Sequence, residues 1–306
     1  MPQPSIDLLA GITTRPVSAA RPRPTILLLD SGVGGLTVLR EVRRARPDAD
    51  YVYAADDAAF PYGDWAEEPL VRRVADVTGT LVERYAPDLV VVACNTISTL
   101  VLPTLRERFR LPFVGTVPAI KPAVAQSRTG RIAVLATPGT VRRDYTRGLV
   151  DAYSGGCAVD LVGSTRLAAF AEAELAGEPV PDEHLAAEIA PCFAERGGRC
   201  TDVVVLACTH YPLLVERMRR LAPWPVAWID PASAIARRVV QILGDAPPGT
   251  VPSDAPGLAA FTGEGRAGEA LRASLGAFGL GRIETGLLPV PPSARDTMID
   301  AAAAAA

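Results

Sequence analysis

The chain has 306 residues, of which 49% are hydrophobic and 21% are charged, and its formal net charge is −3. This composition is typical of a globular protein with enough apolar residues for one large domain or two ordinary ones. The slight charge, without a basic block, argues against nucleic acid as a partner. No apolar run approaches the roughly 18–20 residues that a membrane span needs, so we expect no membrane association.

The first 24 residues are rich in Pro and Arg, and Asp7 interrupts their only apolar patch. We therefore predict a disordered leader over 1–24 rather than a secretory signal. Five cysteines in a chain of this length, without a signal peptide, indicate a reduced, cytoplasmic protein rather than a disulfide framework. The alanine-rich tail at 291–306 carries no chemistry that we can identify.

From residue 25 onward, short apolar runs alternate with longer amphipathic stretches. We predict strands at 25–30, 51–56, 88–94, 113–117, 131–137, 158–163, 202–208 and 226–230. We predict helices at 36–45, 67–85, 98–109 and 232–243. Because the strand runs are continuously apolar, we expect parallel sheets covered by helices on both faces. A Pro/Gly-rich loop follows at 244–257, and residues 258–289 are predicted to add one helix and one strand.

A weak internal repeat divides this α/β pattern into two similar units. "ILLLDSGVGGLTV" (26–38) resembles "IAVLATPGTVRRD" (132–144), and "DLVVVAC" and "DVVVLAC" then end on Cys94 and Cys208. Ligands of open α/β sheets bind beyond the carboxyl ends of the strands. We therefore predict two domains, one formed by 25–116 plus 228–290 and the other by 117–227, with both cysteines facing one cleft.

Two facing cysteines suggest a specific reaction at a carbon atom. A thiolate is a good base, and two bases on opposite faces of a carbon can invert a stereocentre, one removing the proton while the other returns one. The polar residues beside the sulfurs suit an amino-acid substrate, whose carboxylate and ammonium groups they could bind: Ser31, Asn95, Thr96 and Thr209. Asp30, Glu172 and His210 are candidates for tuning protonation, with Glu174 as a competitor of Glu172.

Other chemistries fit the sequence less well. "SGVGGL" lacks the G-x-G-x-x-G spacing of a dinucleotide loop. A zinc site from Cys94, Cys208 and His210 would lack any local C-x-x-C pair. Pyridoxal phosphate needs a lysine for its Schiff base, and the only lysine, Lys121, precedes a proline outside any phosphate-binding loop. We therefore expect no cofactor and no metal.

Five segments, in the same order along the chain, resemble bacterial glutamate racemases. They are "DSGVGGLTVL" (30–39), "AADDAAFPYG" (54–63), "VVACNTIST" (91–99), "VLATPGTV" (134–141) and "LACTHYPLL" (206–214). The resemblance covers roughly residues 25–240. It implies two similar Rossmann-like domains of mostly parallel sheets with the active site between them. It also implies a cofactor-independent enzyme that interconverts L- and D-glutamate and supplies D-glutamate for peptidoglycan synthesis.

The resemblance also implies roles for individual residues. Cys94 and Cys208 correspond to the acid/base pair, and Asp30, Glu172 and His210 to auxiliary groups. The substrate-binding residues are expected to be Asp30, Ser31, Tyr62, Gly63, Asn95, Thr96, Thr137, Thr209 and His210. Ser164-Thr165 stands where family members often carry Cys-Pro, so the choice between Glu172 and Glu174 stays open.

Partners follow from the same resemblance. The expected substrate is glutamate, and we expect a homodimer, although family members dimerise through different surfaces. Some family members bind and inhibit DNA gyrase, which leaves a secondary role for the leader open. The alternatives are an aspartate or broad amino-acid racemase and a catalytically silent binding protein on the same scaffold. His210 favours glutamate over aspartate, because aspartate-specific relatives tend to carry Glu at that position.

Overall fold

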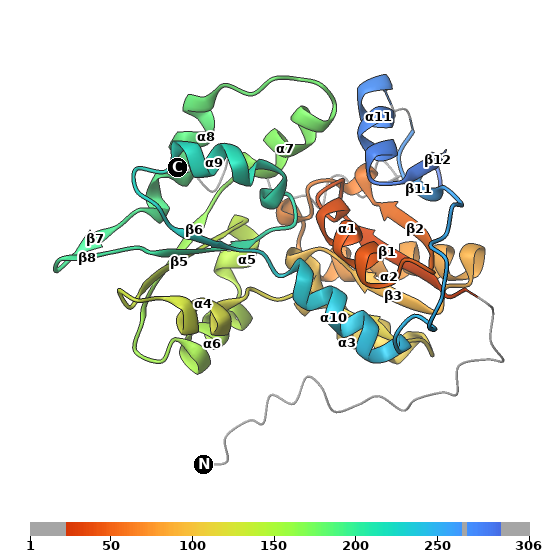
Figure 1. Cartoon of the computed structure of the whole chain (residues 1–306), viewed down its shortest axis with the longest axis horizontal. Helices are drawn as coiled ribbons and strands as arrows, with labels where there is room; N and C mark the ends of the chain where they lie inside the picture. Colours follow the sequence, from red (N-terminus) through yellow and green to blue (C-terminus); the bar gives the residue numbers. More distant parts are fainter. Residues whose placement is uncertain (1–22, 265–267, 289–306) are drawn as a thin grey trace, which may run out of the picture.

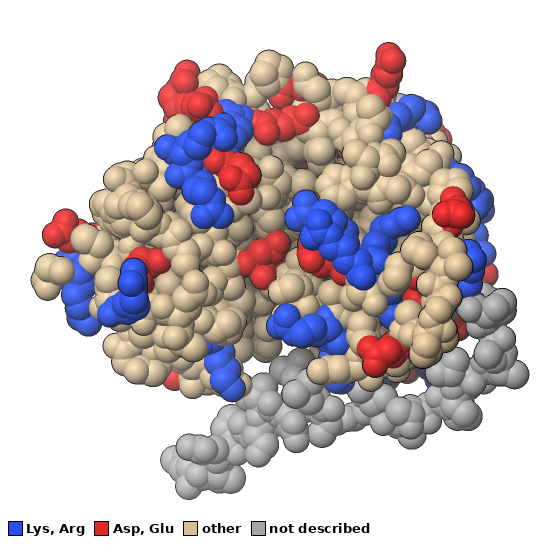
Figure 2. All heavy atoms as spheres, in the orientation of Figure 1, with Lys and Arg blue, Asp and Glu red and all other residues tan. Residues whose placement is uncertain are grey.

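The computed structural model describes residues 23–264 and 268–288, which fold around two separate β-sheets (Figure 1). The predicted tail at 291–306, and all but two residues of the predicted leader at 1–24, lie outside these described residues. Within the described part, no helix combines the length and the apolar composition needed to cross a bilayer. Acidic and basic side chains are interspersed over the face shown in Figure 2.

The larger sheet contains six strands, all of them parallel to their neighbours. In spatial order they are β12 (Leu280–Glu284), β11 (Gly257–Phe261), β2 (Asp50–Ala55), β1 (Thr25–Asp30), β3 (Leu89–Val92) and β4 (Phe113–Val114). β11 differs from the prediction, which placed only a helix and a strand in 258–289. Its run "GLAAF" is short and begins on the glycine that closes the Pro/Gly-rich loop, so the loop pattern hid it.

The smaller sheet contains four parallel strands. They are β10 (Ala227–Ile229), β9 (Val203–Ala207), β5 (Arg131–Ala136) and β6 (Ala158–Gly163), and a short antiparallel hairpin of β7 (Glu195–Arg196) and β8 (Arg199–Cys200) projects from this unit. The order β6-β5-β9-β10 repeats the order β2-β1-β3-β4 of the larger sheet. The internal repeat read from the sequence is thus a repeat of topology, and β3 corresponds to β9.

Helices connect the strands and cover both faces of each sheet. They are α1 (Leu36–Ala45), α2 (Glu67–Tyr85), α3 (Asn95–Arg108), α4 (Ile120–Gln126), α5 (Pro138–Arg142), α6 (Asp144–Tyr153), α7 (Leu167–Leu175), α8 (Asp182–Ile189), α9 (Val215–Leu221), α10 (Ala232–Leu243) and α11 (Glu269–Ala277). Single turns of 3₁₀ helix are η1 (Asp57–Ala59), η2 (Tyr62–Asp64), η3 (Ala190–Cys192) and η4 (Tyr211–Leu214). Helices α1, α10 and α11 cover one face of the larger sheet, and α2 and α3 cover the other.

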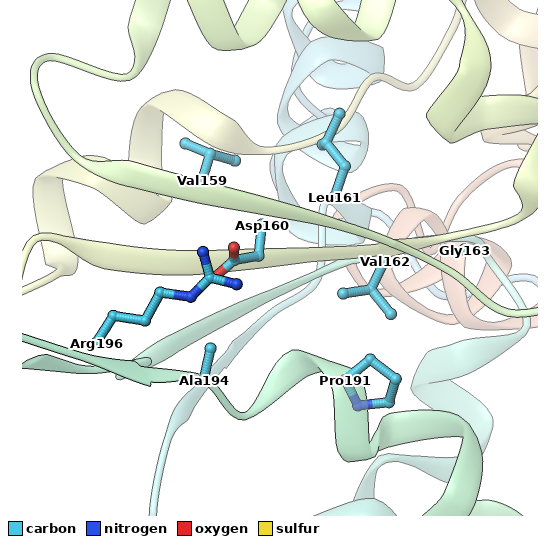
Figure 3. Close-up of a pocket in the computed structure, with 8 residues that line it drawn as sticks. All are labelled: Val159, Asp160, Leu161, Val162, Gly163, Pro191, Ala194 and Arg196. Carbon is cyan, nitrogen blue, oxygen red and sulfur yellow. The ribbon is translucent and has the colours of Figure 1, made fainter.

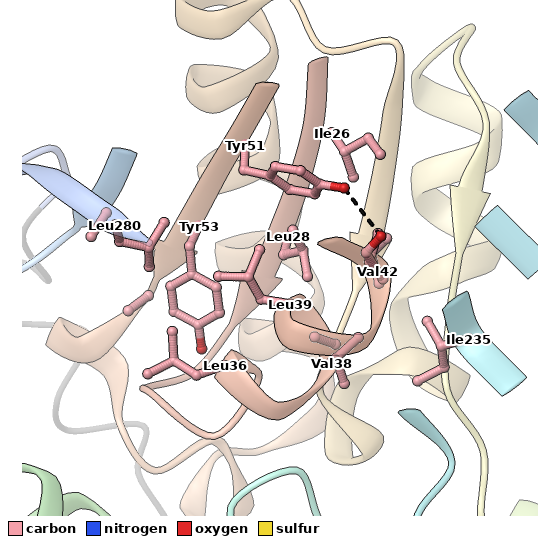
Figure 4. Close-up of a cluster of buried hydrophobic side chains, with 14 of the residues drawn as sticks. Ile26, Leu28, Leu36, Val38, Leu39, Val42, Tyr51, Tyr53, Ile235 and Leu280 are labelled. Carbon is pink, nitrogen blue, oxygen red and sulfur yellow. Dashed lines mark hydrogen bonds between the residues drawn. The ribbon is translucent and has the colours of Figure 1, made fainter. Parts of the chain in front are cut away.

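Alternate residues of each strand supply the two cores of its sheet. Ile26 and Leu28 of β1 pack with Leu39 of α1 and Ile235 of α10, and Leu27 and Leu29 face α2 and α3 (Figure 4). All four β1 residues are fully buried. This two-sided burial explains why the strand sequences are continuously apolar rather than alternating.

The chain passes from the larger sheet to the smaller one after β4 and returns after β10. The predicted boundary at 116/117 falls between β4 and α4, and the predicted return at 227/228 falls inside β10, which pairs with β9. Helix α10 follows directly and packs against α1 of the larger unit. The chain therefore returns to the larger unit in the short segment between Ile229 and Ala232.

Candidate active site

The two predicted cysteines follow corresponding strands of the two sheets. Cys94 caps the N-terminus of α3 just after β3, and Cys208 comes directly after β9. Each is only 6% exposed. Burial raises the pKa of the Cys94 thiol well above its usual range, and the negative charges of Asp30 and Cys208 raise it further. The Thr209 hydroxyl, next to Cys208, donates a hydrogen bond to Asp30 at the end of β1, the neighbour of β3, so the ends of β3 and β9 lie close together.

The start of α3 opposes this rise in the pKa of Cys94. The backbone N–H groups of Ile97 and Thr96 lower that pKa, because free N–H groups at a helix start stabilise a nearby negative charge. A strand that ends on cysteine and opens a helix therefore supplies both burial and a local anion site. Such a thiol is held mostly protonated and becomes a strong base when it ionises.

Cys208 is the first member of a buried chain of polar groups. Its Sγ lies 3.8 Å from His210 Nδ1, and His210 Nε2 lies 2.8 Å from Glu172 Oε1. Burial lowers the pKa of His210, but the hydrogen bonds to Cys208 and Glu172 outweigh it, so that this pKa is raised well above its usual range. The arrangement favours an imidazolium that can donate a hydrogen bond toward the sulfur.

Of the two candidate carboxylates, Glu172 is the one that contacts His210. Its Oε1 also accepts a hydrogen bond of 2.7 Å from the backbone N–H of Val33, in the loop after β1. Glu174, the competitor, forms an ion pair with Arg217 at the surface of the smaller unit. Glu172 in α7 therefore links the smaller unit to the larger one at the site.

Asp30 ends β1 and is fully buried. Its Oδ1 accepts a 2.8 Å hydrogen bond from the Ser31 N–H, and its Oδ2 accepts one of 2.6 Å from the Gly35 N–H. The Thr209 hydroxyl, from the other sheet, donates to the same Oδ2 at 3.2 Å. Asp30 thus holds the glycine-rich loop in shape, contacts the second unit and sets the charge around Cys94.

The glycines of the loop after β1 make room for the opposite unit: a Cβ on Gly32 would overlap Glu172 Oε1, and one on Gly34 would overlap the His210 ring. A side chain at either position would force Glu172 or His210 away. The positions of Glu172 and His210 therefore require residues without a side chain at Gly32 and Gly34.

Three threonine hydroxyls meet where α3 faces α5. Thr96 lies 3.2 Å from Thr137 and 3.3 Å from Thr140, and Thr137 and Thr140 are 3.0 Å apart. Thr137 caps α5 by accepting from the Thr140 N–H, so the loop after β5 is ordered by its own side chain. Thr140 was missed in the sequence, although the T-x-x-T spacing of "TPGT" is a signal for such a cap.

Asn95 carries an unused hydrogen-bond donor. Its side chain is 2% exposed, and its Nδ2 has no protein hydrogen-bond partner among the described residues. Its Oδ1 accepts only a long bond of 3.5 Å from the Thr116 hydroxyl. Buried amides are almost always satisfied, so this donor beside Cys94 is free to bind a further polar group.

Tyr62 and Gly63 both lie on the turn η2, but they make different contacts. The Tyr62 hydroxyl donates to Asp56 Oδ2 at 2.8 Å, and burial raises the pKa of Tyr62 well above its usual range. Its hydroxyl is thus already engaged by Asp56, which also binds Arg73. Gly63 lies beside Thr137, so its backbone rather than the Tyr62 hydroxyl faces the polar cluster.

Two further side chains at the site carried no signal in the sequence. The Phe60 ring lies with its centroid 5.6 Å from that of His210. Arg143, between α5 and α6, donates a hydrogen bond to the Thr96 carbonyl at the start of α3. Of the other cysteines, Cys192 is buried in the core of the smaller unit, whereas Cys157 and Cys200 are only half-buried because they lie in a turn and a surface hairpin.

The surface also carries hollows away from the cysteines. One of about 580 Å³ runs along the edge strand β6, where Figure 3 shows Arg196 of β7 reaching toward Asp160. Another, of about 420 Å³, lies between η2 and α5 and is lined by Gly63, Glu67, Arg142 and Arg143. The first is remote from the polar cluster, and the second borders it through Gly63.

Comparison with known proteins agrees with this geometry. The Asp/Glu/Hydantoin racemase family matches residues 36–239. A glutamate racemase of Brucella ovis is 57% identical over 223 residues, which are 72% of this chain and 80% of that protein. One of Mesorhizobium japonicum is 55% identical over 258 residues, which are 83% of this chain and 97% of that protein.

Solved structures show the same fold. Escherichia coli glutamate racemase, solved with L-glutamate and the activator UDP-MurNAc-ala, superposes with a TM-score of 0.80 at 40% identity, covering 88% of this chain and all of the other. Glutamate racemase RacE1 of Bacillus anthracis gives a TM-score of 0.69 at 25% identity, over 88% of this chain and 99% of the other. The predicted two-domain α/β fold with mostly parallel sheets is confirmed. The chain belongs to the Asp/Glu/Hydantoin racemase family.

Proposed function

We propose that this racemase interconverts L- and D-glutamate by passing the α-proton between two thiols, those of Cys94 and Cys208. Both cysteines follow corresponding strands of a repeated sheet and are buried in one site. The observation that carries the proposal is the pair of hydrogen bonds that join the two units beside the cysteines: the hydroxyl of Thr209, next to Cys208, donates to Asp30, and Glu172, which binds His210, accepts from the Val33 N–H. Two bases at one site are what stereochemical inversion requires. Relatives of at least 55% identity are glutamate racemases.

The reaction balances without an external reagent. In one direction the thiolate of one cysteine removes the α-proton, and the electron pair of the broken C–H bond stays on the α-carbon. The thiol of the other cysteine then donates its proton to the opposite face. The enzyme ends with the charges of the two sulfurs exchanged, and the reverse reaction restores them. No cofactor is needed in this scheme.

The two sides of the site assist the thiols differently. On the Cys208 side, the imidazolium of His210 stabilises the thiolate, and Glu172 holds the ring in place. On the Cys94 side, Asp30 raises the pKa of the thiol and so makes its thiolate a stronger base. Asp30 and Glu172 each also bind the opposite unit, so their effect depends on closure of the cleft.

Substrate binding is proposed for polar groups around the sulfurs. The unused Asn95 amide is a donor for a carboxylate, and the hydroxyls of Thr96, Thr137 and Thr209 are exchangeable donors and acceptors. Ser31 and the backbone of Gly63 complete the set, whereas Tyr62 acts through its packing. Donors held in place before the reaction stabilise the charge that develops on the carboxylate in the transition state.

Polarimetry or circular dichroism of separate L-glutamate, D-glutamate and aspartate solutions tests the substrate. We expect inversion of both glutamate isomers and none of aspartate. Inversion of aspartate at a comparable rate would replace this proposal by a broad-specificity racemase. A folded, reduced protein that inverts neither amino acid would support a silent binding protein.

The cellular role rests on the family resemblance. We propose that the enzyme supplies D-glutamate for peptidoglycan synthesis in the cytoplasm, and growth of a D-glutamate auxotroph carrying this gene tests that role. A homodimer is proposed on the same basis, to be checked by sedimentation. Binding to DNA gyrase is a weaker proposal, tested by a pull-down with and without residues 1–24.

A further inference from the structure

Arg143 joins the two units beside the first cysteine. It lies between α5 and α6, yet its Nη1 donates to the Thr96 carbonyl in the first turn of α3, and its Nε lies 3.5 Å from Glu67 Oε1 at the start of α2. Its side chain is 14% exposed, whereas that of Glu67 is 66% exposed. A guanidinium from the smaller unit is therefore held against two helices of the larger one.

The charge of Arg143 is poorly compensated by carboxylates. Its one ion-pair partner in the described part of the chain, Glu67, is mostly in solvent and at the long end of an ion-pair distance. Burial lowers the pKa of Arg143, and the negative charges of Glu67 and Cys94 act against that fall. A buried cation is costly unless an anion is near. The guanidinium contacts the carbonyl of Thr96, two residues after Cys94, so the Cys94 thiolate is the anion that its position suits.

The other groups that act on Cys94 do not supply positive charge. Asp30 and Cys208 are anionic or become so, and each raises the pKa of the Cys94 thiol. Tyr53 and Tyr62 also interact with Cys94, and burial keeps both phenols neutral by raising each pKa well above its usual range. His210 is bound to Cys208 and Glu172. The N–H groups of α3 lower the pKa of Cys94, and a cation held nearby acts in the same direction.

We propose that Arg143 is a positioning residue for Cys94: it fixes the first turn of α3 through the Thr96 carbonyl and stabilises the thiolate of Cys94. The inference rests on the two-thiol racemase proposed above. Each sulfur then has its own cation, His210 for Cys208 and Arg143 for Cys94. Because Arg143 comes from the opposite unit, its contribution to the stability of the Cys94 thiolate depends on the contact between the two units.

Reactivity of the individual thiols separates this role from a purely structural one. The full-length protein is treated with iodoacetamide at fixed pH, and the alkylation rate of Cys94 is followed by peptide mass spectrometry. A thiolate reacts and a thiol does not, and one pKa unit changes the thiolate fraction about tenfold. We expect Arg143→Gln to slow alkylation of Cys94 about tenfold or more, while the rate at Cys192 stays unchanged.

Two further variants show whether the charge of Arg143 is responsible for the change in the alkylation rate of Cys94. Arg143→Lys keeps the charge and should hold the Cys94 rate within about threefold of wild type, because it preserves the attraction that favours the thiolate. Arg142→Gln removes the neighbouring arginine that lines the same hollow and should leave the rate unchanged. If Arg143 were only a structural tie, Arg143→Gln would loosen α3 and leave the Cys94 rate equal or faster, which would overturn the proposal.

Steady-state kinetics give a second readout on the same proteins. Arg143→Gln should lower kcat about tenfold with a KM for glutamate close to wild type, because Arg143 acts on the base rather than on the substrate. A raised KM with unchanged kcat would contradict the positioning role.

Arg143→Met replaces Arg143→Gln if the latter does not fold by circular dichroism. A wild type that alkylates as expected but does not racemise glutamate would overturn the proposed function and leave the Arg143–Cys94 coupling standing.

Discussion

At the scale of single residues, the pKa values of Cys94 and His210 each depend on named neighbours. His210 is the clearest case, because burial alone would make it neutral and its hydrogen bonds to Cys208 and Glu172 reverse that effect. Glu172, which binds His210, also accepts a hydrogen bond from the Val33 N–H in the loop after β1. The protonation of one side chain is therefore coupled to the stability of the folded protein.

His210→Gln should reveal this coupling through pH. Below about pH 6.5 His210 is protonated in both the folded and the unfolded chain, so its stabilisation is complete. As the pH rises, the unfolded chain loses its proton first, and the stabilisation is lost progressively until the native pKa is passed. The difference in unfolding free energy between wild type and His210→Gln, from urea unfolding at several pH values, should shrink from pH 6 to pH 9. A difference that stays constant or widens would contradict the raised pKa.

Gly32→Ala tests the close approach of the two units. The new methyl group would overlap Glu172 Oε1, so Glu172 must move away from Val33 or His210. We expect a loss of about 1–3 kcal/mol in unfolding free energy, as for other overpacked sites, together with a fall in kcat. Thermal unfolding and racemase assays measure the two effects. Wild-type activity in Gly32→Ala would show that the Glu172 contact is dispensable.

At the scale of elements, the sequence predicts most of the fold because apolar periodicity and termini are strong local signals. Helices α1, α2 and α10 begin and end where the sequence indicated. Strand β11 was missed because a loop composition surrounds it. Arg143 and Phe60 could not be found at all, since their function depends on contacts between segments far apart in the chain.

The choice between Glu172 and Glu174 also could not be made from the sequence. Both lie on α7, two residues apart, and so point in different directions around the helix. Only the position of α7 against η4 decides that Glu172 meets His210 while Glu174 meets Arg217. Helix packing between the units, rather than the residue types, decides which of the two carboxylates contacts His210.

Helix α6 offers a test of local stability that leaves the site alone. Gly148 lies inside α6, its φ is not positive, and a Cβ there would meet no atom within 4 Å among the described residues. Gly148→Ala should therefore raise the unfolding free energy by about 0.4–1 kcal/mol, because alanine loses less backbone entropy in a helix. Urea unfolding measures the gain, and kcat should not change. Destabilisation would mean that α6 requires a glycine for a reason outside these contacts.

At the scale of the whole molecule, two sheets share one strand order, and residues that follow corresponding strands meet between the two units. The contacts between the units include polar ones: Thr209 to Asp30, Glu172 to the Val33 N–H, and Thr96 to Thr137 and Thr140. Polar contacts can break and re-form at little net cost, so they suit a cleft that opens for the substrate. Closure would exclude water from both thiols and strengthen every charge interaction around them.

The exchange of α-protons in deuterium oxide tests the central claim, that two cysteines act on opposite faces of one carbon. Proton NMR would follow L- and D-glutamate separately with wild type, Cys94→Ser and Cys208→Ser, each checked for folding. We expect wild type to invert both isomers with deuterium at the α-carbon, and each variant to lose inversion by about 10²–10⁴-fold. Inversion at the wild-type rate in either variant would contradict the two-thiol mechanism.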